Sequence, residues 1–133
     1  MPAVHIPGEY RKAFLDGGLR EVAPLREALK DGATEIVCVA CHAEHIHDDP
    51  FNYRSLLKLL ERMKDINVNQ IVNNDIINAQ RYVENENLKG NKLKMRVIRP
   101  QAPLKLDMLK FNSDDIAALI VQGFKEGYEF LEA

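Results

Sequence analysis

The amino-acid sequence predicts an α/β domain, in which helices flank a central parallel sheet. A nearly unbroken apolar run over residues 34–41 follows a short helical segment, as in strands that are buried on both faces. Apolar residues then recur with helical spacing over residues 53–83, and a second strand pattern and a final helix pattern come after them. Helices that alternate with strands in this way are typical of α/β folds.

The first part of the chain leads into a glycine-rich turn. Residues 10–15 alternate in polarity and predict a strand or hairpin before the turn Asp16-Gly17-Gly18. A short helix is expected over residues 25–30, because Pro24 is tolerated in a first turn and Asp31-Gly32 ends the segment. In a complete α/β domain the first strand would precede such a turn by a longer stretch. We therefore expect residues 1–133 to form a single, incomplete domain.

Two segments are expected to form the sheet. Residues 35–41 fit a central parallel strand, since their side chains are mostly β-branched or small and apolar. Around residues 94–98, apolar and basic side chains alternate, so one face of that strand is buried and the other is charged. Lysine on such a strand discourages edge-to-edge pairing, which predicts an edge strand.

The long helical pattern changes phase near Asn67. A straight helix over residues 53–83 would be roughly 45 Å long, longer than a domain of this size is wide. We therefore expect a kink or break around residues 66–69. Asn112 or Ser113 caps a last helix, with Asp114 and Asp115 in its first turn. The apolar face of this helix consists of Ile116, Leu119, Ile120, Phe124 and Phe130.

Composition and charge exclude several classes of function. The formal charge of −2 and the pI near 6.1 supply no general attraction for nucleic acid. There is no apolar run of about 18 residues to cross a membrane, and the first ten residues do not resemble a secretory leader. Two cysteines, Cys38 and Cys41, are too few and too close to staple an extracellular scaffold. The expected location is the cytoplasm.

The Asp16-Gly17-Gly18 turn has two interpretations. In the structural one, Asp16 bonds the backbone two residues further on and the glycines only permit positive φ angles. In the functional one, the glycines allow another group to approach the backbone, and Asp16 is a base for a nucleophile from elsewhere in the fold.

The residues around this turn favour the functional interpretation. The segment LDGGLREVAPLREALKDGATEIVCVAC is followed by a long helix with the pair Asn74-Asp75 and by a strand ending in VIRP. Leu109-Lys110-Phe111 then precedes a last helix that contains Gln122-Gly123-Phe124. This order resembles the carboxyl-terminal half of patatin-like phospholipases, over nearly the whole chain. The resemblance implies part of a three-layer α/β acyl hydrolase with a serine-aspartate dyad, in which Asp16, supported by Gly17 and Gly18, is the general base.

The chain departs from the family pattern in two respects. The nucleophile serine of the family lies on a Gly-x-Ser-x-Gly elbow, but no glycine flanks Ser55 or Ser113 here. Val22 stands where the family usually has asparagine, which removes a turn-stabilising hydrogen bond. Without a nucleophile and an oxyanion hole, Asp16 has nothing to activate, so we expect the chain alone to be inactive. The expected partners are a serine-bearing amino-terminal half or a second copy, and in the complete protein a lipid or acyl-ester substrate. No cofactor is expected, and a peripheral location at membranes is an alternative for the complete protein.

Two alternatives remain open. In one, the segment after the first strand binds a metal such as zinc through His42, His45, His47 and Asp48, although no second ligand cluster exists in the sequence. In the other, the chain is a degenerate structural or regulatory partner of another hydrolase. The asparagines at positions 67, 69, 73 and 74 are interpreted as a solvated helix face. Because half of the usual sheet is absent, we also expect apolar surface on the first strand and the long helix to remain uncovered.

Overall fold

The computed structural model describes residues 18, 20–46, 54–104 and 112–132. Within these ranges the chain forms three helices and two strands in an alternating order: α1 (Leu25–Lys30), β1 (Glu35–Val39), α2 (Leu56–Leu88), β2 (Lys94–Ile98) and α3 (Ser113–Glu132). This mixed order confirms an α/β arrangement. The predicted strand or hairpin over residues 10–15 lies outside the described residues.

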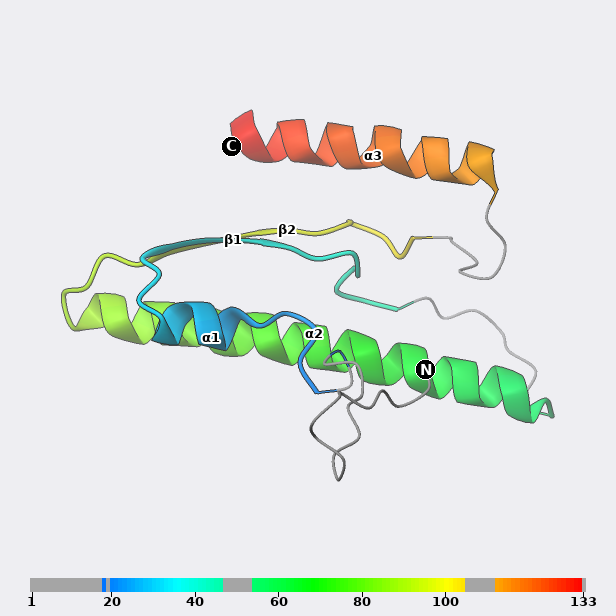
Figure 1. Ribbon diagram of the computed structural model, residues 1–133, viewed down its shortest axis with the longest axis horizontal. Coiled ribbons are helices and arrows are strands. Elements are labelled where there is room, and N and C mark those ends of the chain that lie inside the picture. The colour runs from blue at the N-terminus through cyan, green and yellow to red at the C-terminus, as the bar shows by residue number, and fades with distance from the viewer. Residues whose placement is uncertain (1–17, 19, 47–53, 105–111, 133) are drawn as a thin grey trace, which may run out of the picture.

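The two strands are parallel, and helices lie on both sides of them. β1 and β2 pair in register from Glu35 opposite Lys94 to Val39 opposite Ile98. Helices α1 and α2 lie on one side of the strand pair, and α3 lies on the other (Figure 1). The predicted bounds of the second strand are confirmed, and its Lys94 and Arg96 side chains are exposed as expected.

The core lies between the sheet and α2. Its buried members come from α1, β1 and α2, and Met95 and Val97 of β2 pack against them. The most buried large side chain is Val72, near the middle of α2. The members of this core cluster are Leu25, Ile36, Cys38, Val72, Ile76 and Ala79.

β1 is buried on one face only, so the expectation of a strand buried on both faces was wrong. Ile36 and Cys38 point into the core, whereas Val37 is 47% exposed and Val39 is 70% exposed. The regular strand also ends at Val39, two residues before the predicted end. The cause is the position of α3, which packs against β2 and leaves the same face of β1 open. Among the described residues, β1 has one neighbouring strand and is not central.

α2 continues without a break from Leu56 to Leu88, so the expected kink near residues 66–69 was wrong. The phase change has another cause. With 3.6 residues per turn, Leu56 and Val72 point in directions roughly 160° apart around the helix axis. Leu56 and Met63 therefore point away from the stripe that faces the sheet, whereas Leu57 lies closer to its border, roughly 60° from Val72.

α3 begins as predicted and is held by few contacts. The Asn112 side chain accepts a hydrogen bond from the backbone N–H of Asp114 (3.0 Å), as a capping residue does. The Arg96 guanidinium lies over the Phe130 ring, 4.6 Å from its centroid. No residue of α3 is fully buried, and several of its large apolar side chains are exposed. The expectation of uncovered apolar surface is confirmed for β1 and α2, and α3 has exposed apolar side chains as well.

In the part of the chain that is described, no helix combines the length and the apolar character needed to cross a membrane.

Candidate functional site

The segment that follows the glycine turn is fixed to α2 by one carboxylate. Asp75 Oδ2 accepts hydrogen bonds from the backbone N–H groups of Val22 (3.1 Å) and Ala23 (3.2 Å). These two donors belong to the segment just before Pro24, the N-cap residue of α1. A carboxylate acceptor is favoured at such a position, because charged hydrogen bonds are stronger than neutral ones. Asp75 thus joins the turn region to the middle of α2.

Asp75 was part of the family resemblance, but its contact was not predicted. Val22 stands where the family usually carries an asparagine side chain, and we expected a hydrogen bond to be missing there. The structure shows that the backbone of Val22 is held nonetheless, by a residue 53 positions away in the sequence. No local sequence pattern predicts a contact between residues so far apart. The one available signal is that Asp75 is a carboxylate close to the buried face of a helix, where a charged group usually has a hydrogen-bond partner.

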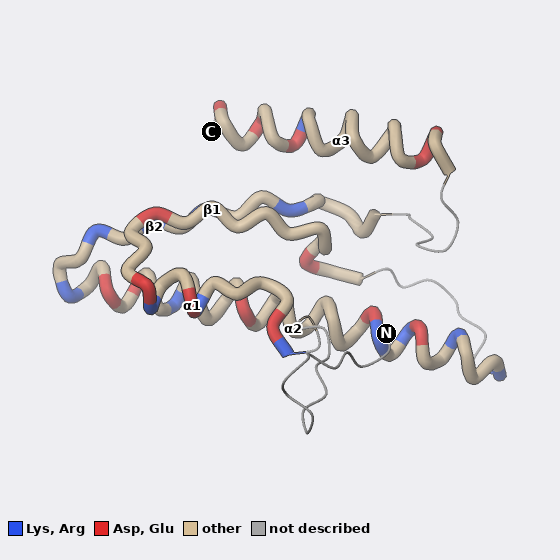
Figure 2. Tube along the Cα trace, in the orientation of Figure 1, with Lys and Arg blue, Asp and Glu red and all other residues tan. Residues whose placement is uncertain are grey.

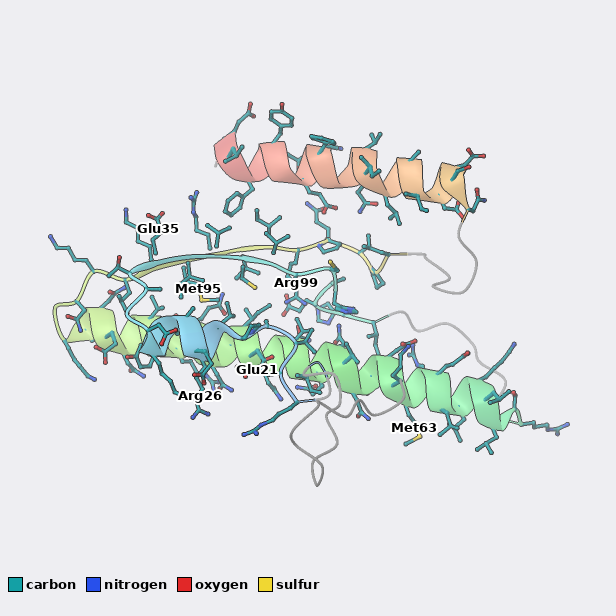
Figure 3. The ribbon with its side chains drawn as sticks, in the orientation of Figure 1. Glu21, Arg26, Glu35, Met63, Met95 and Arg99 are labelled. Atoms are coloured by element: carbon teal, nitrogen blue, oxygen red, sulfur yellow. The ribbon has the colours of Figure 1, made fainter. Side chains whose placement is uncertain are left out.

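A solvent-open cavity of about 1100 Å³ lies beside this junction. The segment from Gly18 to α1 forms one wall, and α2 forms the other with Asp75, Asn78, Ala79 and Tyr82. Arg20, Glu21, Arg26, Glu27 and Lys30 are also among the lining residues, so the rim is strongly polar and carries both charges. Figure 3 shows Glu21 and Arg26 pointing away from the strands, on the side of α1 and α2. Lys30 donates a hydrogen bond to Glu27 (2.8 Å), which lowers the pKa of Glu27 below its usual value.

The predicted catalytic residues are only partly within the described ranges. Asp16 and Gly17 lie outside them, whereas Gly18 lies within them and lines the cavity. Ser55 is the N-cap residue of α2 and Ser113 is the first residue of α3.

A second junction holds the segment after β1 against α2. Asn73 lies at its centre, where its side chain accepts a hydrogen bond from Arg99 Nη2 (2.8 Å) and donates one to the backbone oxygen of Glu44 (2.9 Å). Asn69 donates to the backbone oxygen of Ala43 (2.8 Å), and Arg99 Nε donates to that of His42 (3.2 Å). In Figure 3, Arg99 lies between the end of β2 and α2.

The interpretation of these asparagines as a solvated helix face was therefore wrong for Asn69 and Asn73. Both residues anchor the loop at the carboxyl end of β1, because their amides supply donors for carbonyl groups that leave the sheet. A signal was present in the sequence, since Asn73 directly follows the buried Val72 and lies at the border of the core-facing stripe.

The alternative metal ligands are also only partly described. His42 and His45 lie in the loop after β1, whereas His47 and Asp48 lie outside the described ranges. Within those ranges, no group of three histidine, cysteine or acidic side chains is placed to hold a metal ion. The backbone of His42, rather than its imidazole, makes the contact with Arg99.

The two cysteines lie in different environments. Cys38 is buried in the core beside Ile36 and Val72, whereas Cys41 is exposed in the loop. Burial raises the pKa of the Cys38 thiol; Asp75 adds to this effect, and Arg99 opposes it. Cys38 is thus an unreactive core residue.

Comparison of the chain with family models, with curated proteins and with solved structures found no match. The candidate site is therefore defined by the residues and contacts above alone.

Proposed function

We propose that the chain is the carboxyl-terminal part of a three-layer patatin-like lipid acyl hydrolase of the phospholipase A type. In this proposal it supplies the dyad aspartate, Asp16, while a separate amino-terminal half supplies the serine and the oxyanion hole. Asp16 takes the proton of the serine as that oxygen attacks the acyl carbonyl. Gly17 and Gly18 let the serine-bearing elbow approach the turn closely.

The observation that supports this proposal best is the fixation of the turn region by Asp75. A general base has to be held within hydrogen-bond reach of its nucleophile, about 2.6–3.2 Å, so the loop that carries it needs a rigid support. Two hydrogen bonds from Val22 and Ala23 to Asp75 provide such a support just after Gly18. The adjacent cavity of about 1100 Å³ leaves room for further chain or for a substrate.

The sheet supports the need for a second half. Parallel sheets are normally covered on both faces and contain more than two strands. Here Val37 and Val39 are uncovered, and β1 pairs with one strand among the described residues. We propose that a serine-bearing segment adds beside β1 and brings the nucleophile to Asp16.

The test is hydrolysis of a chromogenic acyl ester. The 133-residue chain alone is expected to give no hydrolysis above a buffer control. Fused to a serine-bearing amino-terminal half, it is expected to turn over, and Asp16→Asn should remove most of that gain because an amide cannot accept the proton. The matched control is Asp31→Asn, since Asp31 also precedes a glycine in a turn but lies at the end of α1. Activity of the isolated chain, or a fused enzyme indifferent to Asp16→Asn, would contradict the assignment.

A further inference from the structure

The N-terminal half of α2 presents apolar side chains that the sheet does not cover. We call Leu56, Leu57, Leu60 and Met63 the leucine face; all four are exposed, with Leu57 at 74% and Leu60 at 51%. This part of α2 extends past the strands (Figure 1), and Met63 points away from them (Figure 3). The apolar stripe that packs on the sheet runs from Val72 to Val83. Leu56, Leu60 and Met63 point roughly 120–180° away from Val72 around the helix axis, whereas Leu57 points only about 60° away from it.

The leucine face lies on the same side of α2 as the candidate site. Five turns of an α-helix take about 18 residues. Leu57 therefore has the same direction as Asp75, and Leu60 has the same direction as Asn78. A flat surface that contacts the leucine face would lie on the side of α2 that carries Asp75 and the cavity.

The charge of this segment differs from that of the whole chain. Residues 54–66 contain four basic and two acidic side chains, whereas the whole chain has a formal charge of −2. Figure 2 shows these charges on the N-terminal part of α2. Lys64 has the same direction as Tyr82 and lies beside Leu57 and Leu60 on the helix surface. The basic residues are Arg54, Lys58, Arg62 and Lys64.

This combination favours a lipid surface over a protein partner. Flexible aliphatic side chains next to lysine and arginine are typical of helices that lie in the interface of an anionic membrane. Protein interfaces are instead enriched in aromatic side chains and depleted of lysine, and residues 54–66 contain no aromatic residue. Lys64, and Arg54 one turn before Leu57, supply positive charge beside the leucine face that is complementary to acidic headgroups, whereas Lys58 and Arg62 point to the other side of the helix.

We propose that the leucine face binds the surface of a bilayer that contains anionic lipids. Leu57 and Leu60 insert among the headgroups, and Lys64 contacts their phosphate or carboxylate groups. In this orientation the turn after Gly18 faces the lipid. Binding requires no catalysis, so it goes beyond the proposed hydrolase function, and its test stands whether or not that function holds.

The experiment is cosedimentation of the 133-residue chain with vesicles. Vesicles of phosphatidylcholine with phosphatidylserine should bind the chain, and vesicles of phosphatidylcholine alone should bind it clearly less. Leu57→Asn with Leu60→Asn should lower binding by about tenfold or more. The matched control is Ile120→Asn with Val121→Asn, which removes two exposed apolar side chains from α3 and should leave binding unchanged.

A charge variant tests the other half of the proposal. Lys64→Gln should lower binding to the anionic vesicles roughly fivefold, and Lys125→Gln on α3 should not. Both lysine variants should keep the fold, because the Lys64 and Lys125 side chains are exposed. If the double asparagine variant loses its helical circular dichroism, Lys64→Gln alone tests whether the leucine face binds anionic lipid.

Three outcomes would overturn the proposal. The first is binding that survives both the Leu57/Leu60 double variant and Lys64→Gln, and the second is equal binding to neutral and anionic vesicles. The third is that the chain sediments with neither kind of vesicle and forms an oligomer in light scattering, and that the variant Leu57→Asn with Leu60→Asn is a monomer. That third result would assign the leucine face to a second copy of the chain.

Discussion

Asp75 of α2 accepts a hydrogen bond from the backbone N–H of Val22, at 3.1 Å. The same oxygen accepts one from Ala23. The segment between the glycine turn and α1 is therefore positioned by a helix that comes much later in the sequence. Any change in the register or direction of α2 at this point moves the turn with it.

Asp75→Ala is expected to lower the free energy of unfolding by about 2 kcal/mol, because two backbone donors lose a charged acceptor. The amide protons of Val22 and Ala23 should exchange faster, as seen by hydrogen exchange with NMR detection. Asn74→Ala is the control, since Asn74 is exposed and, among the described residues, its side chain bonds only Gln70 on the same helix. Unchanged exchange at both amides in Asp75→Ala would show that the carboxylate does not hold the segment.

Asn73→Ala should release the loop after β1. The variant removes the acceptor of Arg99 and the donor to Glu44, and the expected loss of stability is about 1–2 kcal/mol. Limited proteolysis within residues 42–46 should become faster. Asn67→Ala should change neither quantity, since Asn67 is exposed on the same helix and has no side-chain hydrogen bond among the described residues. Equal cleavage rates for the two variants would contradict the role given to Asn73.

Two adjacent isoleucines test the orientation of α2. Ile76 is 4% exposed and lies in the core, whereas Ile77 is 41% exposed. Ile76→Ala is expected to cost about 3 kcal/mol through lost burial and the cavity that remains, and Ile77→Ala less than about 1 kcal/mol. Urea denaturation of both variants gives the comparison. Similar losses would mean that α2 does not present this face to the sheet.

The buried thiol of Cys38 predicts a pH dependence of stability. Its pKa is raised in the folded state by burial, so above the ordinary thiol value of about 8.5 the unfolded chain holds fewer protons than the folded one. Stability should therefore fall as pH rises past that value. Cys38→Ala should show a smaller decline over the same range, as measured by urea denaturation at each pH.

The exposed cysteine provides the control. Cys41→Ala should keep the decline, and at neutral pH a thiol reagent should label Cys41 well before Cys38. Equal labelling rates for the two thiols in the native protein would be inconsistent with a buried Cys38.

Elements with clear local signals were predictable. The ends of α1 follow from Pro24 and from Gly32, whose φ of +88° suits glycine. The bounds of β2 follow from the alternation of Lys94 and Arg96 with apolar neighbours. These signals depend on residues close in sequence, and the structure agrees with them.

Features that depend on distant segments were not predictable in the same way. The apolar run of β1 is equally suited to one or two covered faces, and the position of α3 over β2 decides between them. The phase change in α2 was compatible with a kink or with two apolar stripes that point in different directions. The absence of proline and glycine between Leu56 and Leu88 favoured the second explanation, because sharp kinks usually need such residues. The contacts of Asp75 and Asn73 depend on how the loops return to α2, which no local pattern specifies.

The parallel register of Glu35 with Lys94 has a consequence for the order of folding. The strands cannot meet until the intervening segment has been closed into a large loop, which costs chain entropy. Helix formation takes about a microsecond or less, so α2 can form first and turn most of that loop into one rigid rod. Pairing of β1 with β2 is then the late, rate-limiting step of folding. Substitutions on the sheet-facing side of α2 should therefore slow refolding more than substitutions at its exposed N-terminal end.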